Sequence, residues 1–140
     1  MHDDTITLFN LHRGRWYPCI IDGVHMEHEA AANLTVNGVN NTSTVLFLIG
    51  ASDGCIKSRD GIRKYVPPKI FQQEEDPSWC ITFTPEKDFI LEGEYSGDVV
   101  SEDNFDEGFY HEINSTYDGV HMITASEYLK LIPHFEVAAR

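Results

Sequence analysis

Short apolar segments separated by turn-forming residues run along most of this chain, and their period of two is typical of β-strands. The first segment places Ile6 and Leu8 on one face of a strand and Phe9 and Leu11 on the other. In the second segment, Pro18 predicts an edge position or a bulge, because proline has no N–H to give to a ladder. The predicted strands cover residues 5–11, 16–21, 24–29, 43–49, 79–83, 89–93, 119–123 and 134–137.

Turn signals and face patterns predict how these strands connect. The Asp-Gly pair at 22–23 predicts a tight turn, after which 24–29 returns as the next strand. Residues 43–49 are apolar on both faces, which predicts a central strand covered on both sides.

The most regular alternation lies near the middle of the chain. It points Trp79, Ile81 and Phe83 toward the interior. The following Pro-Glu-Lys-Asp turn leads into the apolar run 89–93, so the two segments are predicted to form a hairpin.

Helical signals are few. One helical turn is expected at 70–73, after Pro67 and Pro68. A short helix is expected to begin at Ser126, or at Thr124, as its N-cap and to end at Pro133. Many short strands and at most one or two short helices predict a mainly β protein, a small antiparallel β-barrel or sandwich with long loops.

The chain of 140 residues is predicted to form one domain, 1–140, with a long acidic excursion at about 95–116. Its formal net charge of −13 is unevenly distributed. Seven acidic and seven basic side chains balance up to residue 70, whereas sixteen acidic and three basic side chains follow. This acidity argues against non-specific binding to nucleic acid and against docking on anionic membranes.

The residues that could carry chemistry form no convincing set. Cys19, Cys55 and Cys80 fit neither a disulfide framework nor a paired zinc site, and we expect free thiols. His25 and His28 would share one face of a helix, as a metal site requires, but they point to opposite faces of the predicted strand. We therefore predict no catalytic residues, no metal and no cofactor.

Several ordered blocks resemble a small uncharacterised family encoded by tailed phages and prophages of Gram-positive bacteria. The blocks are Thr5–Asn10, Trp16-Tyr17-Pro18 with Ile21 and Gly23-Val24, Thr44-Val45, Tyr65-x-Pro67-Pro68-x-x-Phe71, Phe83-Thr84-Pro85-x-x-Asp88-Phe89-Ile90-Leu91-Glu92-Gly93, and Tyr117-Asp118-x-Val120. They span most of the chain, and Trp-Tyr-Pro is the most distinctive.

The resemblance implies a structural protein of the virion, assembled in the host cytoplasm. Such proteins are similar to head-closure, or stopper, proteins of the neck, which form small β-barrels in rings around the DNA channel. The implied partners are further copies of the chain, the portal or adaptor, and tail proteins. DNA would pass through without specific binding, and no membrane would be involved.

This implied role gives the uneven charge a physical meaning, because negative walls repel the phosphates of DNA that slides past them. We expect the acidic set to face the channel lumen or a partner, and the basic set to contact an acidic neighbouring protein. The acidic set is Asp98, Glu102, Asp103, Asp106 and Glu107. The basic set is Lys57, Arg59, Arg63, Lys64 and Lys69.

Two alternatives remain open at this point. A tail terminator or other minor tail component would form a similar ring but would contact the tail tube. A small metal-binding or hydrolytic domain, a distant third, would gather His25, His28 or Cys55 around a pocket. Position in the virion separates the first two interpretations, and metal analysis of the purified protein tests the third.

Overall fold

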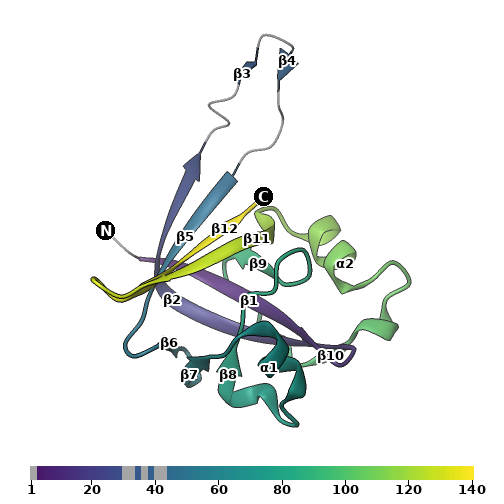
Figure 1. Cartoon of the computed structure of the whole chain (residues 1–140). Coiled ribbons are helices and arrows are strands. Elements are labelled where there is room, and N and C mark those ends of the chain that lie inside the picture. Colours follow the sequence, from purple (N-terminus) through teal and green to yellow (C-terminus); the bar gives the residue numbers. More distant parts are fainter. Residues whose placement is uncertain (1–2, 30–33, 36–37, 40–43) are drawn as a thin grey trace.

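The protein folds as a closed, six-stranded antiparallel β-barrel (Figure 1). The computed structural model describes residues 3–29, 34–35, 38–39 and 44–140. Each barrel strand pairs with the next, and pairing between the last and the first closes the barrel. In order around the barrel the strands are β1 (Asp4–His12), β9 (Phe89–Glu92), β11 (Val120–Leu129), β12 (His134–Ala139), β5 (Thr44–Gly50) and β2 (Arg15–Glu29). The predicted fold class is confirmed.

Shorter elements surround the barrel. A three-stranded sheet, in the order β6-β7-β8, lies near α1 in Figure 1, and α2 lies on another side of the barrel. The tip of the β2–β5 hairpin carries a separate two-stranded pairing, β3 with β4. The remaining elements are β3 (Leu34–Thr35), β4 (Gly38–Val39), β6 (Cys55–Ser58), β7 (Gly61–Tyr65), α1 (Pro68–Gln73), η1 (Pro77–Trp79), β8 (Cys80–Ile81), β10 (Val100–Ser101), η2 (Glu102–Asn104) and α2 (Phe109–Thr116).

The predicted turn at Asp22-Gly23 is wrong, because β2 runs through both residues without reversing. Gly23 has a φ of 71°, in the left-handed region, and the register against β1 shifts at this point. This is the geometry of a β-bulge, which bends a strand instead of ending it. β2 therefore pairs with β1 up to Val24 and with β5 from His25 onward, and it forms the corner that closes the barrel.

The predicted position of β5 is confirmed, but its predicted double coverage is wrong. The strand lies between β12 and β2. Its side chains alternate, with Val45, Phe47 and Ile49 buried and with Leu46 and Leu48 half-buried. A barrel covers the inner face of its strands, whereas Leu46 and Leu48 on the outer face of β5 stay partly exposed.

The predicted hairpin of residues 79–83 with 89–93 is also wrong. Trp79 belongs to η1, which Asp76 caps by accepting a hydrogen bond from the N–H of Ser78, and the indole is 45% exposed. Extended backbone begins only at Cys80, where β8 pairs in parallel with β7. Ile81 and Phe83 are buried as predicted, but β9 pairs with β1 and β11 instead.

One of the two expected helices is present. The turn expected at 70–73 corresponds to α1, whereas the helix expected to begin at Ser126 is replaced by the continuation of β11. An isolated helix of two turns is marginal in water, and pairing with β12 satisfies the same backbone groups. Tyr128 of β11 also packs against Phe135 of β12, with ring centroids 4.7 Å apart.

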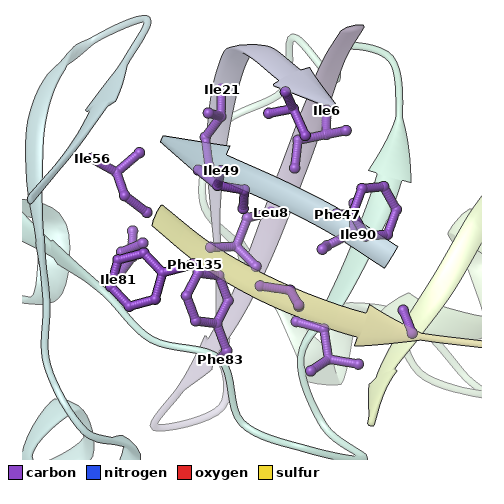
Figure 2. Packing of buried hydrophobic residues seen from close by; sticks show 14 of the residues in the cluster. Ile6, Leu8, Ile21, Phe47, Ile49, Ile56, Ile81, Phe83, Ile90 and Phe135 are labelled. Carbon is purple, nitrogen blue, oxygen red and sulfur yellow. The ribbon is translucent and has the colours of Figure 1, made fainter. Parts of the chain in front are cut away.

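The barrel interior holds the main hydrophobic core (Figure 2). Phe47, Phe83 and Phe135 fill it together with aliphatic side chains from every barrel strand, and all three are at most 2% exposed. A second cluster lies on the outer faces of β1 and β9, where Phe9 stacks on Phe89 with centroids 4.7 Å apart. The first strand thus buries both of its faces, as its pattern predicts.

Candidate functional surfaces

The predicted acidic excursion is built on the second hydrophobic cluster. Residues 95–116 contain β10, η2 and α2, none of which the weak periodicity of the segment predicts. Phe109 and Ile113 of α2 are buried against the outer face of the barrel, and Phe105 packs on Phe109 with centroids 5.1 Å apart. These aromatic contacts hold the acidic side chains of the segment on a fixed support.

Glu102 has a structural role within that support. Its Oε1 accepts a hydrogen bond from the indole N–H of Trp16 at 2.9 Å and another from the backbone N–H of Phe109 at 2.8 Å. Phe109 is the first residue of α2, so the carboxylate satisfies one of the free N–H groups at a helix start. Glu102 thus joins β2 to the start of α2, and its carboxylate is held within the fold.

The other four predicted acidic residues, Asp98, Asp103, Asp106 and Glu107, are exposed. The last two line a cleft of about 480 Å³ at the start of α2. Within this cleft, Nε2 of His111 lies 2.6 Å from Oε2 of Glu107. We call it the acidic cleft and define it by Phe105, Asp106, Glu107, His111 and Glu112.

The five predicted basic residues do not form one patch. Arg59 is tied within the fold, because its guanidinium binds Asp22 at 2.7 Å and also contacts Glu94. Hydrogen bonds from Arg59, then from Thr5, hold the pKa of Asp22 below its usual range. Arg63 is half-buried, and Lys69 lies on α1. The structure therefore separates Arg59, Arg63 and Lys69 from the remaining two lysines.

Those two lysines share the exposed face of the β6–β7 hairpin. Lys57 is the cross-strand partner of Ile62, and Lys64 lies two residues further along the same face. Ile62 is 69% exposed, while Ile56 on the opposite face is buried in the main core. We call Lys57, Ile62 and Lys64 the basic ridge.

A buried polar network joins β1 to the turn before β9, and the sequence patterns do not predict it. Asp88 is fully buried and accepts hydrogen bonds from the N–H of Leu11, the N–H of Thr84 and the side-chain amide of Asn10, each at 2.9 Å. Burial raises the pKa of Asp88 to about 6, and these hydrogen bonds only partly oppose the shift. The only local signal is an acid directly before an apolar run, which also fits an exposed turn.

A cavity of about 510 Å³ opens beside this network. Leu11 and Pro68 contribute apolar wall, and Arg13, Lys69 and Lys87 contribute positive charge. Arg13 also donates to the carbonyls of Gln72 and Gln73 at the end of α1, which fixes α1 to the β1–β2 turn.

A comparison with models of known protein families assigns the chain to one family. The profile of DUF6751, a family of unknown function, matches residues 1–140. The chain belongs to the DUF6751 family. No curated protein and no solved structure matched it.

The cysteines and histidines of this DUF6751 chain are placed as the sequence predicts. Cys19 and Cys80 are buried, Cys55 is half-buried, and all three are free thiols. His25 and His28 both lie in β2, three residues apart, and this odd spacing points them to opposite faces of the strand. Within the described ranges, no three His, Cys, Asp or Glu side chains gather as a metal site requires, and no helix is long and apolar enough to span a membrane.

Proposed function

We propose that this DUF6751 chain is a structural subunit of a phage neck, where copies form a head-closure ring around the DNA channel. Three observations support the proposal. Sequence blocks along most of the chain resemble a phage-encoded family, the fold is a closed barrel, and four of the five predicted acidic residues are exposed in a segment that packs on the second hydrophobic cluster.

The observation that carries the proposal is that exposed carboxylates belong to a segment anchored to the outside of the barrel. Asp98 and Asp103 are exposed on either side of β10, which pairs with β2, and Glu102 fixes the start of α2. Fixed negative charges at the wall of a channel repel DNA phosphates and give a sliding duplex no counterions to release. A surface of this kind suits a conduit that DNA must pass without sticking.

The decisive experiment locates the chain in particles of the phage or prophage that encodes it. We expect mass spectrometry to detect the chain in purified virions, and antibody labelling to mark the junction of head and tail. Labelling on the ends of free tails made without heads would instead support the tail-terminator alternative. Absence from washed, purified particles would overturn both structural roles.

A second measurement tests the meaning of the acidic surface. Reversing the charge of Asp98 and Asp103 to lysine should create affinity for duplex DNA that falls steeply with salt, whereas the wild-type chain should show none. Reversing Glu127, an exposed acid on β11, together with Asp118 gives a matched control. Equal DNA binding by the two variants would show that position on the fold is irrelevant.

A further inference from the structure

The basic ridge has the composition of a protein contact. Ile62 is a large apolar side chain that is 69% exposed, and an amine on each side of it points to the same face of the hairpin. Protein–protein interfaces commonly have an apolar centre surrounded by charged groups. Burial of the apolar side chain stabilises the complex, and the charges determine its orientation.

The two lysines of the ridge are also electrostatically available. None of the ion pairs found in the described part of the chain involves a lysine, whereas Arg59 at the adjacent turn is already bound to two carboxylates. In a chain with a net charge of −13, unpaired cations on an exposed face fit an acidic partner.

The acidic cleft offers the complementary chemistry on another side of the barrel. Asp106, Glu107 and Glu112 supply carboxylates, and the half-buried ring of Phe105 supplies an apolar wall. Figure 1 shows β6–β7 and α2 at well-separated positions around the barrel. The ridge and the cleft of one molecule therefore do not meet each other.

We propose that the basic ridge of one copy docks into the acidic cleft of a second copy. Ile62 packs against Phe105, and the amines of Lys57 and Lys64 bind the carboxylates of Asp106, Glu107 and Glu112. Because each copy uses two different surfaces, the contact is head-to-tail and can continue until a ring closes. This inference rests on the proposed ring and names the interface that would form it, and it leaves Asp98 and Asp103 for the channel.

The test uses two charge-reversal variants of the full chain, K57E/K64E and D106K/E107K, followed by sedimentation velocity across a concentration series. We expect wild-type association to weaken on going from about 50 mM to about 300 mM NaCl, because salt screens charge pairs. Each variant alone should associate at least about tenfold more weakly than the wild type. Circular dichroism and thermal unfolding confirm that both variants fold.

Mixing the two variants provides the sharper result. In an equimolar mixture the reversed ridge of one variant faces the reversed cleft of the other, and the unaltered ridge faces the unaltered cleft. Association should therefore return to near the wild-type level. The control variant K87E/K130E carries the same change in charge on lysines outside the ridge and should associate like the wild type.

Three outcomes would overturn the contact. They are a wild-type chain that stays monomeric at both salt concentrations, a K57E/K64E variant that associates normally, and a mixture that fails to recover association. None of them decides the proposed function, which depends on location in the virion. A chain found at the neck with normal assembly of K57E/K64E would retain the ring and refute this interface alone.

Discussion

Asp88 provides the most informative perturbation of the fold. Replacing it with asparagine keeps the size of the side chain but exchanges one acceptor oxygen for an NH₂ group. If the remaining oxygen stays with the N–H of Leu11, the new NH₂ faces the N–H of Thr84 and the amide of Asn10, which are both donors. Leaving buried donors without an acceptor destabilises a protein by about 1–3 kcal/mol.

The effect of Asp88→Asn should depend on pH in a definite direction. The pKa of Asp88 is raised from its ordinary 3.8 to about 6 by burial, so the folded state holds a proton that the unfolded state has released. A raised carboxyl pKa contributes stability that is present below the unfolded value and is lost as the pH rises through the folded value. The full contribution is about 3 kcal/mol, and about 1 kcal/mol of it lies between about pH 8 and about pH 5.5.

Urea unfolding of wild type and variant at those two pH values measures the difference directly. Trp16 is buried in the second cluster, so its fluorescence reports the loss of tertiary structure. We expect the free energy of unfolding to differ between the two proteins by about 1 kcal/mol more at about pH 5.5 than at about pH 8. Asp98→Asn, on the exposed connection before β10, controls for the change in net charge.

The opposite trend would refute the reasoning. If the difference between wild type and Asp88→Asn shrinks as the pH falls, the three hydrogen bonds outweigh burial and the carboxylate is ionised in the fold. A difference that does not change with pH would show that Asp88 does not titrate in this range.

Three further substitutions test the supports described above. Glu102→Ala should lower the free energy of unfolding by about 2 kcal/mol, because two hydrogen bonds to a carboxylate are lost. Glu102→Gln keeps an acceptor oxygen and should lower it less. Equal losses in urea unfolding would contradict the role of Oε1. Gly23→Ala should cost about 1–2 kcal/mol because φ is 71°, and an unchanged midpoint would mean that the bulge relaxes. Phe89→Ala removes a fully buried ring from the aromatic cluster and should cost about 3–5 kcal/mol by the same assay, whereas a loss below about 1 kcal/mol would show that the support under α2 is not needed.

Local patterns predicted the strands well where one residue in two faces the interior. Ile6 and Leu8 turn into the barrel and Phe9 turns out to the second cluster, as their alternation requires. The failures occur where a long-range partner decides. Asp-Gly is compatible with a tight turn and with a bulge, and only pairing of β2 with both β1 and β5 selects the bulge.

In the candidate surfaces too, local patterns predict some features, and others depend on residues far away in the sequence. Exposure of Asp103, Asp106 and Glu107 follows from composition alone. The structural role of Glu102 depends on its hydrogen bond from Trp16, which is 86 residues away in the sequence. The pairing of Arg59 with Asp22 and Glu94 likewise joins distant segments, so no local pattern could remove Arg59 from the predicted basic set.

The position of β12 in the barrel constrains how the chain folds during its synthesis. β12 follows the other five barrel strands in the sequence, yet it lies between β11 and β5, and it pairs residues 134–139 with residues 45–50. Until it inserts, β5 and β11 both present unpaired backbone edges, which are sites of aggregation. The barrel therefore cannot close until residues 134–139 have left the ribosomal tunnel, and closure then depends on contacts between distant parts of the sequence, which form slowly.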